Sequence, residues 1–291
     1  MKPAAFDYIA PTSLEAAVAA LVEANGDGKV MAGGQSLTPL LNFRMTRPAI
    51  IVDLMHIPDL SFVECRGPSV AIGAMTRHVD LEFSRLIADK LPVMSAAMPH
   101  VAHLAIRNKG TIGGSLSHAD PAAELPMLAV FYDATIRVQG PGGRRDIAAS
   151  DFFVSALTNC LEPDEIVVEI EFPVLGAHTG WAFEEVARRF GDFALASVAL
   201  SIERRGDEVV DLRVAVMGVA DTPLRLFEAE AALRGARIGA SSASEFAEVV
   251  RACVSPNTDI HVSAEYRLNL VGALAERAFR TAWQRAAGGA S

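Results

Sequence analysis

Two short segments, each built around a pair of glycines, constrain this chain more than any other feature of its sequence. The first is Ala32-Gly33-Gly34-Gln35-Ser36, which follows a predicted strand at residues 29–32 and precedes a helix predicted to restart at Thr38-Pro39. The second is Thr111-Ile112-Gly113-Gly114-Ser115. Paired glycines permit a positive φ, and successive N–H groups in such a turn can bind an anion. Two such turns could together bind a diphosphate, although each alone could be no more than a tight turn.

Other features of the sequence exclude several binding functions. Neither segment continues into Gly-Lys-Ser/Thr or matches G-x-G-x-x-G, so neither a Walker loop nor an ordinary Rossmann nicotinamide site is indicated. The 26 Lys and Arg residues against 35 Asp and Glu residues give a net charge of −9, which argues against a nucleic-acid binder. Three scattered cysteines, Cys65, Cys160 and Cys253, cannot hold an iron–sulfur cluster. The residues alone therefore favour a phosphate or dinucleotide binder.

The sequence also bears on localisation and on metal binding. No apolar run approaches the roughly 18 residues of a membrane span, and no signal-peptide apolar region follows the first residues, so we expect a cytoplasmic protein. His100, His103 and His118 could suggest a metal site, but a pair three residues apart on a predicted helix at residues 91–104 is more typical of packing or capping. We expect no metal on this chain and find no compelling catalytic base.

The pattern of strands and helices predicts two domains, residues 1–175 and 176–291. Strands and helices alternate up to about residue 55, which predicts a small α/β subdomain, and residues 56–175 form a second subdomain. A glycine-containing linker is expected at residues 176–180.

Three local patterns predict where helices begin and what they cover. Thr12 to Glu15 form a capping box in which Thr12 is the expected N-cap. Asp120-Pro121 is expected to start another helix. Strands at residues 193–202 and 209–217 precede three predicted helices, which indicates an antiparallel sheet covered by helices on one face.

The glycine segments and their neighbours resemble the FAD-binding medium subunit of the molybdenum hydroxylases, the family of carbon monoxide dehydrogenase and of the flavin domain of xanthine dehydrogenase. The similar motifs, which occur in the same order and with similar spacing, are residues 32–37, 107–115, 118–126 and 183–194. The resemblance covers nearly the whole chain and implies an α+β fold. That fold is a vanillyl-alcohol-oxidase-type FAD-binding domain of two α/β subdomains, followed by a C-terminal antiparallel sheet with helices.

The resemblance also implies which residues bind FAD. Ala32 to Ser36 and Thr111 to Ser115 would hold its pyrophosphate through backbone N–H groups. Glu124 would bind a ribityl or ribose hydroxyl, although an acidic residue in a first helical turn could equally be a partner of the helix dipole. Leu161 and the turn Gly191-Asp192-Phe193 would lie near the isoalloxazine ring.

Two positions depart from the family pattern. Ser115 stands where many relatives have Asn, which would weaken one hydrogen bond. Glu184-Glu185 stands where some relatives have a lysine near the flavin, which leaves open how the flavin potential is tuned.

The function implied by the resemblance is that of an oxidoreductase subunit that transfers electrons. FAD would accept electrons one at a time from [2Fe–2S] clusters on a small partner subunit, originating at a molybdenum cofactor on a large molybdopterin-binding subunit, in a dimer of heterotrimers. An external acceptor would then take them from the flavin. Two alternatives are a self-sufficient flavin-dependent oxidase or dehydrogenase and a flavin-free assembly subunit. The substrate of the complete enzyme is not encoded in this chain.

Overall fold

The computed structural model describes residues 2–287, and these residues form two compact units. The first unit contains the chain up to Leu86 together with His103–Ala119 and Asp133–Pro173. The second contains Ile87–Ala102, Asp120–Tyr132 and the chain from Val174. The chain thus passes between the units several times before residue 175.

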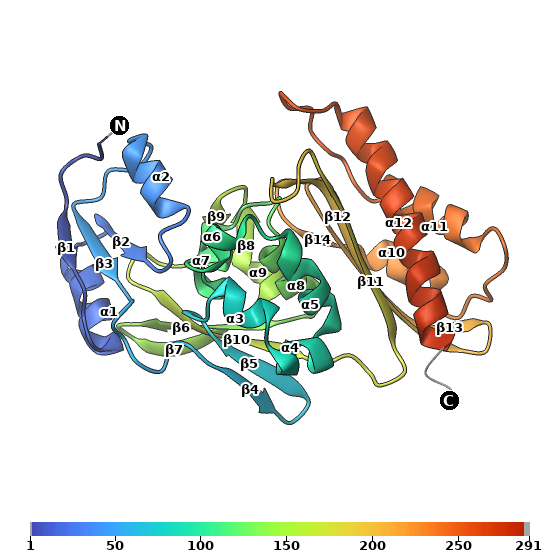
Figure 1. The fold of residues 1–291 in the computed structure, drawn as a ribbon, viewed down its shortest axis with the longest axis horizontal. Helices are drawn as coiled ribbons and strands as arrows, with labels where there is room; N and C mark the ends of the chain where they lie inside the picture. Colours follow the sequence, from blue (N-terminus) through green and yellow to red (C-terminus); the bar gives the residue numbers. More distant parts are fainter. Residues whose placement is uncertain (1, 288–291) are drawn as a thin grey trace. The chain divides into compact units, whose positions relative to one another are not determined.

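A three-stranded parallel sheet opens the first unit (Figure 1). Its strands lie in the order β1 (Asp7–Ile9), β3 (Ile50–Asp53) and β2 (Gly28–Met31). The helices α1 (Leu14–Glu23) and α2 (Leu37–Asn42) connect these strands. The apolar face of α1 is buried in one cluster with residues of β3, which gives the small α/β subdomain its core.

The second sheet of the first unit is antiparallel throughout. Its strands lie in the order β4 (Val63–Arg66), β5 (Ser69–Gly73), β10 (Ile166–Pro173), β6 (Thr135–Gly140) and β7 (Gly143–Ala148). Ile166 and Val168 of β10 belong to the cluster that contains α1, so the two sheets share part of one core. The shorter elements here are α3 (His78–Glu82), α6 (Leu104–Arg107), α7 (Ile112–His118), α9 (Ala149–Phe152), β8 (Phe153–Ser155) and β9 (Thr158–Asn159).

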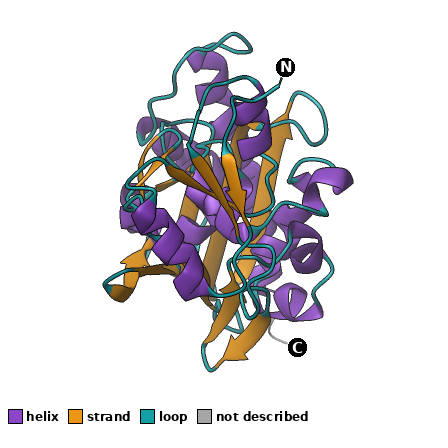
Figure 2. Ribbon diagram, turned by 90° about the vertical axis from the view of Figure 1, so that its left-hand side faces the viewer, coloured by secondary structure: helices purple, strands orange, loops and turns teal. Residues whose placement is uncertain are grey.

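The second unit is built on a four-stranded antiparallel sheet, and Figure 2 distinguishes its strands and helices by colour. In order, the strands are β11 (Gly180–Ala187), β12 (Ala194–Arg205), β13 (Glu208–Met217) and β14 (Leu224–Arg225). Its helices are α5 (Pro92–Ala97), the 3₁₀ turn η1 (Met98–His100), α8 (Glu124–Phe131), α10 (Phe227–Leu233), α11 (Ser242–Ala252) and α12 (Ala264–Ala287). The remaining helix, α4 (Arg85–Lys90), lies where the chain passes from one unit to the other.

Helices cover both faces of this sheet, and the prediction of a single covered face is wrong. Ala196, Val198 and Leu200 of β12 pack into the cluster formed with α11 and α12, while the alternate residues Leu195, Ser197 and Ala199 are buried as well. Figure 1 shows α5 and α8 on the side of the sheet opposite α12. Every residue of α8 is buried, because this helix lies inside the unit.

Three predicted helix boundaries also differ from the structure. Ser13 rather than Thr12 is the N-cap of α1, since Ser13 Oγ accepts the N–H of Ala16 (3.2 Å). The Asp120 carboxylate accepts the N–H of Ala122 (2.9 Å) in a turn, and α8 begins only at Glu124. The helix predicted at residues 91–104 breaks after η1, where Ala102 has a φ of 45°.

Within residues 2–287, no helix combines the length and the apolar character that a membrane crossing requires. The same part of the chain brings together no group of three or more His, Cys, Asp or Glu side chains that could hold a metal ion.

Candidate functional site

The two glycine segments lie against each other in the first unit. A Cβ atom on Gly33 would stand 2.1 Å from the Lys109 carbonyl oxygen and 2.8 Å from Gly110 Cα. A Cβ atom on Gly114 would stand 3.5 Å from Ala32 Cβ. The absence of a side chain at Gly33 is therefore what allows these two parts of the chain to touch.

The first segment presents a row of backbone donors. Gly34 has a φ of 69°, which reverses the chain between β2 and α2. The carbonyl oxygens point inward to local partners, since Gln35 Nε2 donates to Gly33 O (2.9 Å) and the N–H of Thr38 donates to Gly34 O (3.0 Å). The N–H groups of residues 33–36 donate to no acceptor within residues 2–287. Such a row of donors fits an anionic group.

The second segment is the first turn of a helix and differs from the expected open turn. Thr111 is the N-cap of α7, and its Oγ1 accepts the N–H of Gly114 (3.2 Å). The N–H of Ile112 donates to Thr76 O (3.1 Å), that of Gly113 to Ala74 O (2.8 Å) and that of Ser115 to Thr111 O (3.0 Å). These N–H groups are therefore already used within the protein. Gly113 is required for packing, since its Cβ would stand 2.6 Å from Ala74 Cβ.

Residues of α3 and its N-cap Arg77 hold the stretch that precedes the second segment, and sequence reasoning missed them. Arg107 donates from Nε to Glu82 Oε2 (2.7 Å) and from Nη2 to Glu82 Oε1 (3.3 Å), with both side chains largely buried. Arg77 Nη1 donates to Asn108 O (2.6 Å), and the N–H of His78 donates to Gly110 O (2.9 Å). The only available signal was the charge of Arg107 within the motif, because nothing local identifies a partner 25 residues away.

Leu161 is linked, within the first unit, to α7, the helix that begins in the second glycine segment. Its N–H donates to Asn159 Oδ1 (2.9 Å), and Asn159 Nδ2 donates to Ser117 O (2.6 Å) near the end of α7. The structure therefore connects Leu161 to α7 through one asparagine.

Glu124 and Asp192 lie in the second unit. Glu124 is 6 % exposed and is the first residue of α8, where a carboxylate is stabilised by the helix dipole. Asp192 accepts a long hydrogen bond from Arg188 Nη2 (3.5 Å), and its N–H donates to Arg189 O (3.0 Å).

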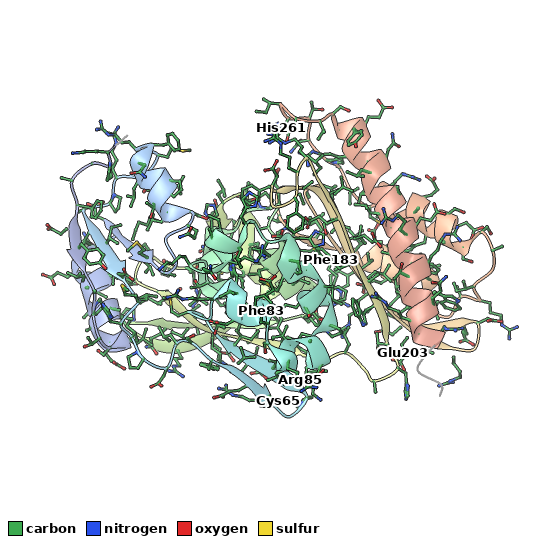
Figure 3. All side chains as sticks on the ribbon, in the orientation of Figure 1. Cys65, Phe83, Arg85, Phe183, Glu203 and His261 are labelled. Carbon is green, nitrogen blue, oxygen red and sulfur yellow. The ribbon has the colours of Figure 1, made fainter. Side chains whose placement is uncertain are left out.

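A pocket of about 480 Å³ lies within the second unit and includes Asp192 in its wall. Arg188, Phe193, His261 and Arg267 also line it, and His261 is labelled in Figure 3. Arg267 is 8 % exposed and donates to the carbonyl oxygen of Leu195 (2.6 Å) and to the carboxylate of Asp259. The wall is apolar at the exposed ring of Phe193 and polar where arginine and aspartate side chains line it.

Glu184 and Glu185, which stand where some relatives have a lysine, form ion pairs within the second unit. Glu184 Oε2 is 2.8 Å from Arg277 Nη2, and Glu185 Oε1 is 3.4 Å from His100 Nδ1. The His100 ring meets Phe183 edge-on with a centroid separation of 5.3 Å, and Phe183 is labelled in Figure 3. These carboxylates therefore have structural partners of their own.

Comparison with known families and proteins gives matches along almost the whole chain. Residues 4–175 match the family described as the FAD binding domain in molybdopterin dehydrogenase, and residues 181–282 match the CO dehydrogenase flavoprotein C-terminal domain. The chain is 40% identical over 286 residues to caffeine dehydrogenase subunit beta of Pseudomonas sp. (strain CBB1), with 98% of this chain and 97% of that protein covered. It is 38% identical over 288 residues to the 6-hydroxypseudooxynicotine dehydrogenase complex subunit alpha of Paenarthrobacter nicotinovorans, with the same coverage.

Solved structures show the same likeness. A chain of carbon monoxide dehydrogenase from Hydrogenophaga pseudoflava superposes with a TM-score of 0.95 at 37% identity, covering 98% of this chain and 99% of that one. This similarity confirms the predicted α+β fold, in which an FAD-binding domain precedes a C-terminal antiparallel sheet with helices.

Proposed function

Because this chain belongs to the family of FAD-binding medium subunits of molybdenum hydroxylases, we propose that its first glycine segment binds the diphosphate of FAD. One observation supports this assignment: the N–H groups of residues 33–36 donate to no acceptor within residues 2–287. The first of these residues, Gly33, has no room for a side chain. Backbone donors can neutralise a diphosphate without Lys or Arg, which suits a chain of net charge −9. The residues present therefore fit the phosphates of the cofactor.

The other cofactor contacts follow from motif position. Thr111 to Ser115 would lie against the phosphates through the half-buried side of α7 that carries Gly114 and Ser115, with Ser115 as the hydroxyl donor. Glu124 would accept a hydrogen bond from a ribityl or ribose hydroxyl. Leu161 and Asp192 would lie near the isoalloxazine ring, and Phe193 would offer it an aromatic surface.

When bound, FAD supplies redox chemistry that accepts electrons singly or in pairs. The residues of this chain would bind and orient it between an iron–sulfur donor and an external acceptor. We propose that the partners are a large molybdopterin-binding subunit and a small [2Fe–2S] subunit, assembled as a dimer of heterotrimers. The solved form of carbon monoxide dehydrogenase from H. pseudoflava, a structural relative, lacks the Mo-pyranopterin moiety of its molybdenum cofactor. A molybdenum cofactor therefore belongs to that enzyme, which supports this assignment.

Two further assignments complete the proposal. We assign residues 1–175 to the FAD-binding domain, with subdomains at about 1–55 and 56–175, and residues 176–291 to the C-terminal domain. A cytoplasmic location is supported by three unpaired cysteines, of which Cys65 is exposed and labelled in Figure 3.

The test is FAD binding by the purified chain. Gly33→Ala should weaken binding at least about tenfold, because the new Cβ would collide with the Lys109 carbonyl. Gly142→Ala is the matched control in the same unit, since a Cβ at Gly142 meets nothing within 4 Å. A chain without flavin absorbance, before or after incubation with FAD, would refute the proposal. Oxidation of a small reductant by the isolated chain would favour the self-sufficient enzyme instead.

A further inference from the structure

His78 is a buried imidazole that the proposed cofactor site does not use. It is the first residue of α3 and is 6 % exposed. Neither ring nitrogen makes a hydrogen bond of good geometry within residues 2–287, although the backbone of Thr111 lies near enough to act on the pKa of the ring. A buried polar ring without partners is costly, so its position calls for a physical reason.

The imidazole occupies the space that a side chain at Gly110 would need. A Cβ atom on Gly110 would stand 2.9 Å from both Nδ1 and Cε1 of His78. The backbone N–H of His78 also donates to Gly110 O (2.9 Å), so ring and backbone contact the same residue. His78 and Gly110 are therefore complementary in shape.

The same stretch of backbone sets the position of Gly33. The Lys109 carbonyl and Gly110 Cα are the atoms that a Cβ on Gly33 would meet, at 2.1 and 2.8 Å. Gly110 is thus close to both His78 and Gly33. If Gly110 moved because its contact with the His78 ring changed, Gly33 and the N–H groups of residues 33–36 would move with it, because tightly packed interiors transmit strain.

The ring is neutral at physiological pH. The pKa of His78 is lowered to about 4, mainly by burial; the backbone of Thr111 opposes this shift and the charge of Arg107 adds to it. Glu82, on the same helix, is already paired with Arg107. The imidazole therefore contributes by filling space and carries no charge.

We propose that His78 is a positioning residue for FAD binding: its ring fills the space behind Gly110 and so fixes the 107–110 stretch against Gly33. This inference rests on the proposed function, because it assumes that residues 33–36 hold the FAD diphosphate.

The experiment is a double-mutant cycle on the full chain, with the FAD dissociation constant measured by flavin fluorescence. His78→Ala should weaken binding about tenfold by leaving the 107–110 stretch unsupported, and Gly110→Ala should weaken it at least as much. The variant with both changes should bind FAD more tightly than Gly110→Ala alone, because removal of the imidazole makes room for the new methyl group. His56→Ala, which alters an exposed histidine of the same unit, should leave binding unchanged.

Effects that simply multiply in the double variant would overturn the proposal. Should Gly110→Ala fail to fold, as judged by circular dichroism, His78→Leu against His78→Ala decides the question. Leucine restores most of the volume and should bind FAD as the wild type does, whereas equal losses in both variants would refute the role. If the wild-type chain binds no FAD, the proposed function fails first and this inference fails with it.

Discussion

The imidazole of His78 couples the stability of the chain to pH. Its pKa is about 4 in the folded chain against an ordinary value of 6.5, so the unfolded chain binds more protons between these two values. Stability therefore falls as the pH falls from 6.5 towards 4, by up to about 3 kcal/mol from this one buried group. Below pH 4 both states are protonated and the contribution of His78 is fully lost.

We expect His78→Leu to reduce this pH dependence. The difference in free energy of unfolding between pH 7 and pH 4.5, measured by urea denaturation, should be smaller in the variant than in the wild type by about 2–3 kcal/mol. His56→Leu, at an exposed position, should show the wild-type difference. An unchanged pH dependence in His78→Leu would mean that the ring is not buried in its neutral form.

At the scale of single elements, α3 and α6 are joined by one buried ion pair. The side chains of Arg107 and Glu82 are only 8% and 12% exposed, and two hydrogen bonds connect them. Loss of one member leaves the other charge desolvated, which costs more than the pair itself contributes.

Glu82→Ala should therefore destabilise the chain by about 3 kcal/mol, measured as the free energy of unfolding in urea. The matched control is Glu64→Ala in the same unit, which removes a partner of Arg66 at a distance of 2.9 Å. Both members of that pair are well exposed, so a loss below about 1 kcal/mol is expected. Equal losses in the two variants would show that burial does not decide the strength of the Arg107 pair.

The elements also show how far the sequence could predict this fold. The spacing of apolar residues was sufficient for α1, β3 and β10, where local pattern and tertiary burial agree. It failed at residues 112–115, because two glycines disfavour a helix and the reason for Gly113, its contact with Ala74, is tertiary.

The candidate site was predictable to a similar extent. The glycine segments were visible as motifs, and their contact through Gly33 and Gly110 was not, since it depends on the path of the chain between them. His78 and Glu82 were missed for the same reason: their partners lie well away in sequence.

At the scale of the whole molecule, the sequence boundary at residue 175 lies next to the last passage of the chain between the compact units, after Pro173, but it misses the earlier passages. Residues 87–102 and 120–132 precede that boundary but belong to the second unit. The helix α8 is the clearest case, because all its residues are buried and it contacts β12, β13 and β14. Its apolar surface is thus covered by strands that follow residue 193.

A fragment that ends at residue 175 should therefore expose α8 and fail to behave as a folded monomer. The fragment would expose most of the apolar surface of α8, and exposed apolar surface favours association between molecules. We therefore expect the fragment to aggregate in size-exclusion chromatography and to bind the dye ANS strongly. The matched control is a full-length chain cleaved after residue 175 by an inserted protease site, in which both pieces remain together and α8 stays covered. A monodisperse fragment without ANS binding would show that α8 is stable without the strands of the second unit. The two family domains would then fold separately, although the chain of the second unit is interleaved with that of the first.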